Sequence, residues 1–272
     1  MRLPKPSPTS AALITGASAG IGLEIARQLG ARGHTLVLVA RRKDRLRKLA
    51  AELTATYGVR AESVAADLSK EASRRRVPGR LTELELDVDI LVNNAGFATN
   101  GRFDESELAR ELEQVRVLVE ANVALTSAFL PGMVERGRGA ILNVASTAGM
   151  QPLPYSAGYS AAKAYVLTFS EALHTEQRGR GITVTALAPG PVATEFWQIS
   201  GWEVQGGQTF EKAVPRPAWI SAEEAARAGV EGLEAGRRVV VPGLTVRAAM
   251  QAARYLPHAV KLPAIEWMMR RR

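Results

Sequence analysis

Tyr159 and Lys163 are the two residues whose types and spacing point most directly to proton-transfer chemistry. They lie four positions apart in the run Tyr-Ser-Ala-Ala-Lys, and the surrounding periodicity predicts a helix, so both side chains face the same way. An ammonium about 5 Å from a phenol, at an effective dielectric near 20, favours the phenolate by roughly 3 kcal/mol, or about two pKa units. The pair alone predicts either an acid/base tuned in this way or an ordinary amphipathic helix with a surface lysine.

Three glycines form a candidate phosphate-binding loop near the N-terminus. Gly16, Gly20 and Gly22 follow the first predicted strand and open the first predicted helix, with the spacing GxxxGxG rather than GxGxxG. Small residues at this place let backbone amides approach a pyrophosphate at the N-terminus of the helix. A tight turn that binds no ligand is the alternative interpretation.

The residues after the second predicted strand bear on the choice of nicotinamide cofactor. The sequence there reads Val-Ala-Arg41-Arg42, so two guanidinium groups stand where a carboxylate would bind the ribose 2′-hydroxyl of NAD(H). Guanidinium groups form bidentate, charge-assisted bonds with phosphate, which favours NADP(H) over NAD(H). Alternatively, both arginines only begin a basic helix at 41–48.

Short β-branched runs alternate with longer amphipathic segments along the chain. We expect strands at 12–15, 35–40, 63–66, 89–92, 140–145, 183–187 and 239–241, and helices at 21–31, 43–57, 106–134, 155–177 and 221–235. Helices of this length between strands indicate crossover connections and a mostly parallel sheet. The expected fold is α/β and doubly wound, of Rossmann type, with about seven strands, helices on both faces and a short helical C-terminal extension.

Ligands bind beyond the carboxyl ends of the strands in such sheets, and the residues after these strands carry further motifs. Together with the Tyr-x-x-x-Lys pair, they resemble the short-chain dehydrogenase/reductase family. The resemblance covers about residues 10–242. It rests on TGASAGIG at 15–22, NNAG at 93–96, Asn122, Ser146, the pair itself, and PGPVAT at 189–194, in the family's order.

The resemblance implies an oxidoreductase that interconverts a carbonyl, either ketone or aldehyde, and an alcohol with NADP(H). Tyr159 would be the general acid/base, and Lys163 would lower its pKa and hydrogen-bond the nicotinamide ribose. Ser146 would hold the substrate oxygen, and Asn122 would support a water that connects the lysine to solvent. Hydride chemistry belongs to the cofactor, whereas the protein aligns the reacting carbon and stabilises the developing alkoxide.

The resemblance also implies a set of cofactor-binding residues. Asp67 would bind the adenine edge, Asn93 would secure the strand beside the cofactor, and Thr194 would help to orient the carboxamide. Ala19 stands where some NADP-preferring relatives have a basic residue, so the two arginines alone carry that preference. The set is Gly16, Ser18, Ala19, Gly20, Ile21, Gly22, Arg41, Arg42, Asp67, Leu68, Asn93, Ala95, Gly96, Tyr159, Lys163, Pro189, Gly190, Val192 and Thr194. No metal ligands are expected.

We expect a flexible leader at 1–10, then a single Rossmann-type catalytic domain at 11–243 that includes a substrate lid at 194–220. Aromatic residues are frequent in this lid, which indicates an apolar or bulky substrate beneath it. They are Phe196, Trp197, Trp202, Phe210 and Trp219. The alternative is that these rings pack the lid onto its own helices or onto a neighbouring subunit.

The segment 244–272 is expected to form a basic helical extension. A basic amphipathic helix can lie on an anionic bilayer or dock on a neighbouring subunit. Because Pro257 and Pro263 should keep its helices short, membrane contact is the less favoured of the two. Its apolar residues at helical spacing are Leu262, Ile265, Met268 and Met269.

Composition limits the compartment and the chemistry. The 272 residues include no cysteine, which excludes disulfides, thiolate metal sites and a cysteine nucleophile and fits a reducing cytoplasm. Residues 1–10 lack the apolar stretch of a signal peptide. The most apolar helical region, 115–134, contains Arg116, Glu120 and Asn122, so we expect a cytoplasmic protein without a membrane span.

A net charge of +8 leaves two other classes of function open. One is a basic module that binds nucleic acid or a membrane surface, and the other is a non-catalytic sensor that binds a dinucleotide to report redox state. The basic clusters have no helix-turn-helix, zinc-finger or aromatic RNA-binding motif, so no nucleic-acid partner is expected. A sensor has no need of Ser146, Tyr159 and Lys163 together. The expected partners are a small carbonyl or alcohol substrate and copies of this chain, as a homodimer or homotetramer.

Overall fold

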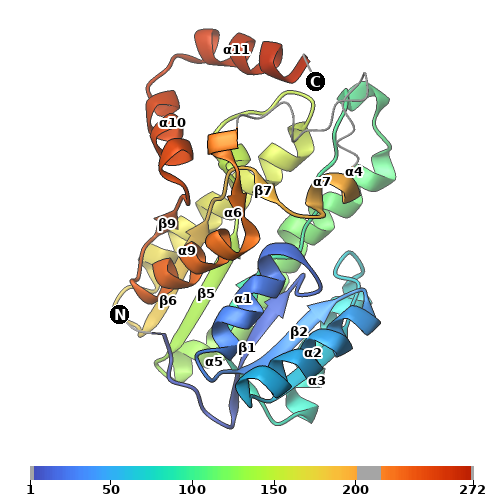
Figure 1. Cartoon of the computed structure of the whole chain (residues 1–272), viewed down its shortest axis with the longest axis vertical. Helices are drawn as coiled ribbons and strands as arrows, with labels where there is room; N and C mark the ends of the chain where they lie inside the picture. The colour runs from blue at the N-terminus through green and yellow to red at the C-terminus, as the bar shows by residue number, and fades with distance from the viewer. Residues whose placement is uncertain (1–2, 201–215, 271–272) are drawn as a thin grey trace.

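The computed structural model describes residues 3–200 and 216–270 and is built around one seven-stranded sheet (Figure 1). The strand pairings in this sheet are parallel, in the order β3-β2-β1-β4-β5-β6-β9. The strands are β1 (Ser10–Thr15), β2 (Thr35–Ala40), β3 (Ala61–Ala65), β4 (Asp87–Asn93), β5 (Gly139–Val144), β6 (Ile182–Leu187) and β9 (Val239–Val240). The expected doubly wound α/β fold is confirmed.

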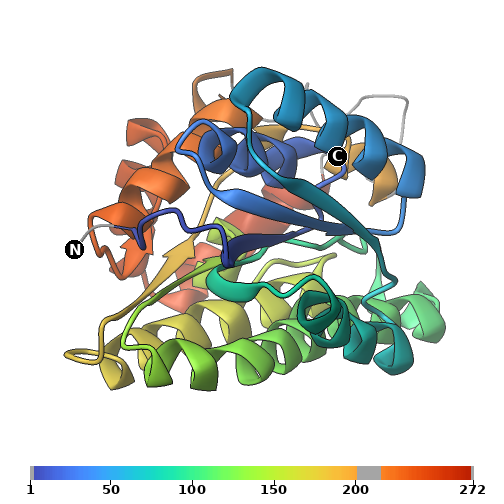
Figure 2. The same cartoon turned by 90° about the horizontal axis from the view of Figure 1, so that it is seen from below.

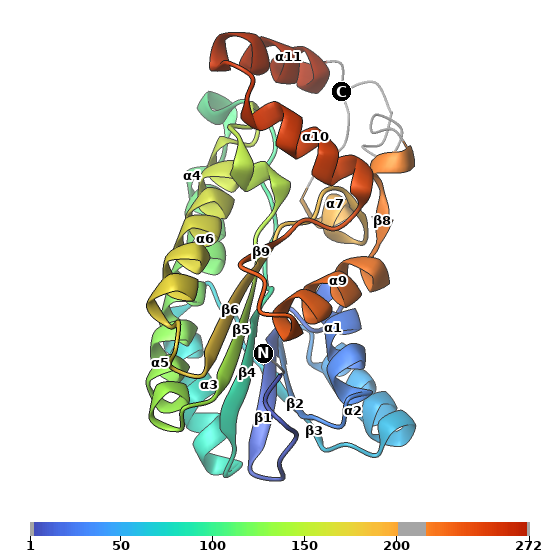
Figure 3. The ribbon, with the colours of Figure 1, turned by 90° about the vertical axis from the view of Figure 1, so that its left-hand side faces the viewer.

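Helices cover both faces of the sheet (Figure 3). One face carries α1 (Gly20–Gly30), α2 (Lys43–Tyr57) and α9 (Ala222–Glu234), and the other carries α3 (Glu71–Glu83), α5 (Ala121–Glu135) and α6 (Ala157–Glu176). Figure 2 shows the same layers edge-on, with blue and orange helices above the sheet and green and yellow helices below it. Each layer encloses its own apolar core.

Burial of the sheet on both faces explains why its strands could be predicted from the sequence. Every residue of β1, β2, β5 and β6 is buried, and such strands appear as continuous apolar runs. The predicted boundaries of all seven strands agree with the structure to within two residues. The chain reverses its direction of winding between β1 and β4, which places a ligand crevice at the carboxyl ends of these two strands.

The helix α3 was not predicted from the sequence. α3 contains Pro78 and Gly79, and its apolar contribution to the core is limited to Val77 and Leu81, so its periodicity is weak. The basic residues of α3 are not all exposed to solvent. Arg74 is buried and donates to the Leu68 carbonyl at 2.8 Å and to Glu120 at 2.8 Å, which fixes the loop after β3.

The single long helix expected at 106–134 is divided by a π-helical turn. α4 (Leu108–Val115) passes through π-helical residues Arg116–Glu120 into α5. By length and composition alone Leu108–Glu135 could cross a membrane, with a third of its most apolar window buried in the protein. In the structure α5 packs along β4 and β5, so this helix contributes to the core.

The segment after β6 contributes two short strands that form a second, separate sheet. β7 (Val192–Ala193) pairs in parallel with β8 (Ile220–Ser221), and α7 (Phe196–Ile199) lies between them in sequence. α10 (Leu244–Arg254) and α11 (His258–Arg270) follow β9 and extend along the top of the molecule (Figure 1). Trp202 and Phe210, and the side chains of Met268 and Met269, lie outside the described part.

The C-terminal extension differs from expectation in two respects. Pro263 lies inside α11 and does not end it, so the helix is 13 residues long. Proline removes one backbone hydrogen bond, and a packed helix can tolerate that loss. Ile265 is 7% exposed and packs with Leu153, Tyr155 and Trp197 of the same chain. The extension therefore docks on its own subunit, an arrangement that the sequence analysis did not consider.

A buried polar chain joins the sheet to the helices beneath the crevice. Asn93 Nδ2 donates to Asn143 Oδ1 at 2.9 Å and to Thr126 Oγ1 at 3.2 Å, linking β4, β5 and α5. Asn143 Nδ2 then donates to Ser170 Oγ at 2.9 Å, and that hydroxyl donates to the Val166 carbonyl on α6. Hydrogen bonds of this kind fix the relative position of four elements, because a buried polar group left without a partner is costly.

We predict that Asn143→Ala lowers the free energy of unfolding by about 2 to 4 kcal/mol, since it creates a cavity and removes one buried hydrogen-bond partner from each of Asn93 and Ser170. Thr175→Ala, on the exposed side of α6, should change it by less than about 0.5 kcal/mol. Urea unfolding followed by circular dichroism measures both. Equal losses in the two variants would show that the buried chain contributes nothing specific.

Candidate active site

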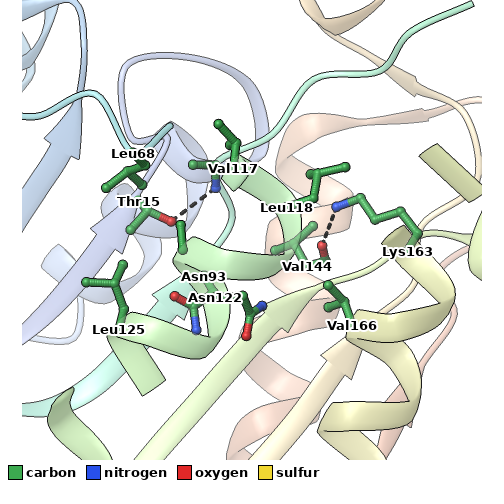
Figure 4. A pocket seen from close by; sticks show the side chains of 12 residues that line it. Thr15, Leu68, Asn93, Val117, Leu118, Asn122, Leu125, Val144, Lys163 and Val166 are labelled. Carbon is green, nitrogen blue, oxygen red and sulfur yellow. Dashed lines mark hydrogen bonds between the residues drawn. The ribbon is translucent and has the colours of Figure 1, made fainter. Parts of the chain in front are cut away.

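Tyr159 and Lys163 lie on the first turns of α6 and are both buried, at 8% and 5% exposure. The Lys163 Nζ lies 5.8 Å from the centre of the Tyr159 ring. It donates a hydrogen bond of 2.6 Å to the carbonyl of Val144, the last residue of β5 (Figure 4). The structure thus places the two side chains on one face of the helix, as their spacing predicts, and excludes the surface-lysine alternative.

The pKa values of this pair shift in directions that the sequence argument did not anticipate. Burial raises the pKa of the Tyr159 phenol to about 12, although its hydrogen bond with Ser146 acts in the opposite direction. Burial also lowers the pKa of the Lys163 ammonium to about 8. The expected lowering of the phenol pKa is therefore wrong for the ligand-free protein, because the Coulomb estimate neglected the loss of hydration that disfavours both charged forms.

Ser146 reaches the phenol from the end of β5. It is extended and caps the 3₁₀ turn Thr147–Met150, where its Oγ accepts from the Ala148 amide at 3.1 Å. A Cβ added to Gly149 would overlap the Lys163 backbone, so only glycine lets this turn lie so close to α6. The close contact sets the serine hydroxyl beside Tyr159, which makes Ser146 and Tyr159 a hydrogen-bonded pair of hydroxyls.

Asn122 and Lys163 line the same small cavity (Figure 4). The centre of a water molecule could occupy about 10 Å³ of this cavity, which is close to the room that one water needs. The Asn122 side chain is 5% exposed, and its Oδ1 has no hydrogen-bond partner among the residues that the structure describes. An acceptor without a partner beside a buried ammonium gives a water in this cavity two polar groups to bind.

The glycine loop has the geometry of an anion site. Gly16 and Gly20 have φ of +66° and +57°, which other residues adopt only with strain, and a Cβ on Gly22 would collide with Asn94 Nδ2 and the Gly16 carbonyl. Ala19 precedes α1 without offering a side-chain cap. The first amides of α1 therefore remain available to a phosphate group at the positive end of the helix.

Two residues that were not singled out from the sequence hold this loop against β4. Thr15 Oγ1 donates to the Val92 carbonyl at 3.1 Å and accepts from the amides of Asn94 and Ala95 at 2.9 and 3.0 Å. The Asn94 Nδ2 donates to the Thr15 carbonyl at 2.9 Å. Both residues lie inside the motifs TGAS and NNAG, so the motifs themselves were the available signal.

Basic side chains gather at the N-terminus of α2. Arg42 donates from Nε and Nη2 to Ser18 Oγ of the glycine loop at 3.2 and 3.0 Å. Arg42 and Arg45 both bind the Glu195 carboxylate at 2.8 Å, whereas Arg41 is more exposed and lies 3.5 Å from Glu113. Arg45 and Glu195 were missed in the sequence. Arg45 stands three residues after Arg42 on the predicted helix, but nothing in the sequence locates Glu195 there.

The remaining predicted cofactor residues border the crevice. Asp67 accepts hydrogen bonds from the Ser69 hydroxyl and amide; burial raises its pKa, but these bonds outweigh burial and leave the pKa below its ordinary value. A Cβ on Gly96 would lie 2.6 Å from Leu118. The predicted cofactor residues that follow the ends of β3, β4 and β6 lie at the crevice, and they are Asp67, Leu68, Ala95, Gly96, Pro189 and Gly190. The side chain of Asn93 points instead into the buried polar chain, which fits its expected role of securing the strand.

Thr194 connects the crevice to the aromatic lid. A Cβ on Gly20 would lie 3.2 Å from Thr194 Cγ2, so this threonine lies against the N-terminus of α1. Its Oγ1 accepts from the Phe196 amide at 3.3 Å, and Trp197 Nε1 donates to the Val192 carbonyl at 2.7 Å. These bonds fix the beginning of α7 beside the glycine loop.

The described aromatic residues of the lid pack on the acid/base and on one another. The Phe196 ring lies 5.8 Å from the ring of Tyr159 and 5.3 Å from that of Trp197, which in turn lies 5.7 Å from Trp219. Ile265 of α11 completes this cluster. The described aromatic residues of the lid therefore pack on Tyr159 and on the protein's own helices, which agrees with the alternative interpretation from the sequence.

The residues present fit a phosphorylated dinucleotide. A Cβ at the glycines of the loop would fill the space that a phosphate needs, and the first amides of α1 lack a side-chain cap. Arginines lie where the adenosine ribose is expected. The described residues contain no group of three His, Cys, Asp or Glu side chains that could hold a metal ion.

We predict that the stability of the wild-type protein relative to Lys163→Met increases by about 2 kcal/mol between pH 7 and 9.5. The pKa of Lys163 is lowered from 10.5 to about 8 on folding, so the penalty for burying the ammonium is complete below pH 8 and is relieved as pH rises toward 10.5. Methionine carries no titrating group, and Tyr159 is present in both proteins. Urea unfolding across this range gives the difference, and a constant difference would contradict a desolvated ammonium.

Comparison with known proteins agrees with this geometry. Residues 10–202 match the family model described as short chain dehydrogenase. A very-long-chain 3-oxoacyl-CoA reductase of Anas platyrhynchos is 38% identical over 75% of this chain, and this match spans only 64% of that protein. An NADP-dependent 3-hydroxy acid dehydrogenase of Salmonella typhi is 36% identical over 73% of this chain and 80% of its own length.

A solved structure shows the same arrangement of elements. The short-chain dehydrogenase from Sphingobium yanoikuyae in complex with NADPH is 36% identical, and the two superpose with a TM-score of 0.79 over 89% of this chain and 91% of that one. With its fold, its buried tyrosine and lysine, and the family match over residues 10–202, the chain belongs to the short-chain dehydrogenase family of oxidoreductases.

Proposed function

We propose that this enzyme is an NADP(H)-dependent carbonyl reductase and alcohol dehydrogenase that uses Tyr159 as its general acid/base and accepts an apolar substrate. The observation that carries the proposal is the Tyr159 hydroxyl, bound to Ser146 and buried beside Lys163 at the carboxyl end of the sheet. Two hydroxyl groups in an apolar surrounding can both hydrogen-bond to one carbonyl or alcohol oxygen of a substrate.

Each of the four residues has a part that follows from its contacts. The bound nicotinamide supplies or accepts the hydride. Tyr159 gives its proton to the substrate oxygen during reduction and takes one during oxidation, while the Ser146 hydroxyl holds that oxygen in line. After the phenol has given up its proton, Lys163 supplies another, and Asn122 positions a water in the adjacent cavity through which the lysine regains its proton from solvent.

The phenol of the ligand-free protein is in the form that donates a proton during reduction. A tyrosine with a pKa of about 12 is fully protonated at neutral pH and ready to donate to a developing alkoxide. Lys163, with a pKa of about 8, can replace that proton near neutral pH. Both shifts have the same cause, which is the closure of the site against water.

NADP(H) is the proposed cofactor because the end of β2 carries arginines and no carboxylate. Arg41 and Arg42 lie at the N-terminus of α2, and Arg42 already contacts the glycine loop through Ser18. The Sphingobium neighbour was solved with NADPH, and the Salmonella relative is described as NADP-dependent. These names support the same preference in this chain.

An apolar substrate is favoured by the walls around Tyr159. Phe196 packs on the phenol, and Trp197, Trp219 and Ile265 continue the apolar surface toward α11. The Anas platyrhynchos relative is named for a very-long-chain acyl substrate, which agrees with a site of this character.

We also propose that the enzyme is a homodimer or homotetramer. Leu108, Leu112 and Val115 of α4 are 69%, 43% and 38% exposed, and Tyr165 of α6 is 43% exposed. Apolar side chains of this size on neighbouring helices favour contact with another subunit over contact with water.

We predict that Tyr159→Phe lowers turnover of ketones by at least about 100-fold, because the proton donor is lost while the packing with Phe196 is kept. NADPH binding should persist, and this separates an enzyme from a redox sensor. Tyr165→Phe, which changes an exposed tyrosine on the same helix, is the matched control and should keep full activity. NADPH absorbance and NADPH fluorescence are the two readouts. Retained turnover in Tyr159→Phe would refute the assignment.

We predict that Arg41→Ala raises the KM for NADPH about 10-fold and leaves the KM for NADH nearly unchanged, because only NADPH has the phosphate that the guanidinium would bind. Arg60→Ala, another exposed arginine paired with an acidic residue, controls for net charge. Steady-state kinetics with both cofactors would decide. An equal change for NADH and NADPH would indicate that Arg41 only begins the helix.

A further inference from the structure

The Glu195 carboxylate forms a bridge across the cofactor crevice. Its Oε2 accepts from Arg42 at 2.8 Å, and both of its oxygens accept from Arg45 at 2.8 and 2.9 Å. Arg42 in turn binds Ser18 in the glycine loop. One acidic side chain from the segment after β6 is therefore held by the basic end of α2 on the other side of the crevice.

The same residue begins the helix that covers the acid/base. Glu195 is the N-cap of α7, and its carbonyl accepts from the Ile199 amide at 3.1 Å. Phe196, the next residue, packs on Tyr159, and Ser200 at the end of α7 accepts from the Ala98 amide at 3.0 Å. The position of α7 over the substrate site is thereby linked to the arginines at the cofactor site.

A carboxylate and a phosphate compete for donors of this kind. Both present a pair of oxygens that can accept forked bonds from a guanidinium group. Hydrogen bonds from Arg42 and Arg45 hold the pKa of Glu195 below its ordinary value, so the carboxylate is ionised at neutral pH. A cofactor phosphate that approaches these arginines meets both occupied donors and a negative charge.

We propose that Glu195 occupies part of the 2′-phosphate site in the ligand-free protein, so that a bound phosphate displaces it and loosens α7 over the substrate site. This inference rests on the proposed NADP(H) function and adds a specificity-determining residue to it. By linkage, the factor by which Glu195 weakens phosphate binding equals the factor by which bound phosphate weakens the hold on Glu195.

The first test measures binding with Glu195→Gln, which keeps the size of the side chain and removes its charge. We expect the dissociation constants of NADPH and of adenosine 2′,5′-bisphosphate to fall about 5-fold, the low end for coupled sites because Glu195 is partly exposed. NADH, which lacks the phosphate, should bind as it does to the wild type. Glu52→Gln removes an equally exposed carboxylate that pairs with Arg27 at 2.7 Å and should leave all three unchanged.

The second test measures hydrogen exchange without any turnover. The amides of Ile199 and Ser200, which bond within α7, should exchange faster in ligand-free Glu195→Gln than in the ligand-free wild type. Adenosine 2′,5′-bisphosphate, which has no nicotinamide, should cause the same acceleration in the wild type. Glu52→Gln should exchange like the wild type in both states.

Four outcomes would overturn the inference. Unchanged or weaker binding of NADPH to Glu195→Gln would show that the carboxylate does not compete, and equal tightening for NADH would show a general charge effect. Unchanged exchange in α7 would remove the link to the substrate site. Failure of the wild type to bind NADPH would overturn the proposed function as well, whereas normal wild-type binding with indistinguishable variants would overturn this inference alone.

Discussion

The active site depends on keeping one ammonium group out of water. Lys163 is almost fully buried, and its charge is tolerated because the Val144 carbonyl lies 2.6 Å away and a cavity shared with Asn122 has room for a water. The carbonyl comes from the end of β5, the asparagine from the long helix and the lysine from α6. An unpaired buried charge is so unfavourable that these three elements must be placed together, and Tyr159 one turn away shares the same closed environment.

Much of this arrangement could be predicted from local patterns. Strands buried on both faces are continuous apolar runs, and the spacing of Tyr159 and Lys163 fixes a common helix face. The three glycines were predicted from their place between a strand and a helix, and their positive φ angles or close contacts explain why glycine is needed. The direction of the tyrosine pKa was wrong, because spacing gives the distance between charges but not the hydration that each loses.

Features that depend on contacts distant in sequence could not be predicted. The bridge from Glu195 to Arg42 joins residues about 150 positions apart, and no local signal marks it. α3 was missed because Pro78 and Gly79 obscure its short apolar face, and its boundary is secured by the buried Arg74, which in isolation is an unlikely core residue. The passage of α11 through Pro263 likewise follows from the packing of Ile265 against Trp197 and Leu153, not from helix propensity.

The π-helical turn before α5 keeps a row of buried side chains on one side of the helix. Gln114, Leu118, Asn122 and Thr126 are all buried and follow one another at intervals of four residues. A regular α-helix turns about 100° per residue, so each such interval drifts by about 40°, and the last of the four would be rotated by about 120° from the first. The wider turn at 116–120 takes up this drift. It lets one continuous helix keep Gln114 against Thr99 at one end and hold Asn122 beneath the lysine further along, without a break in the backbone.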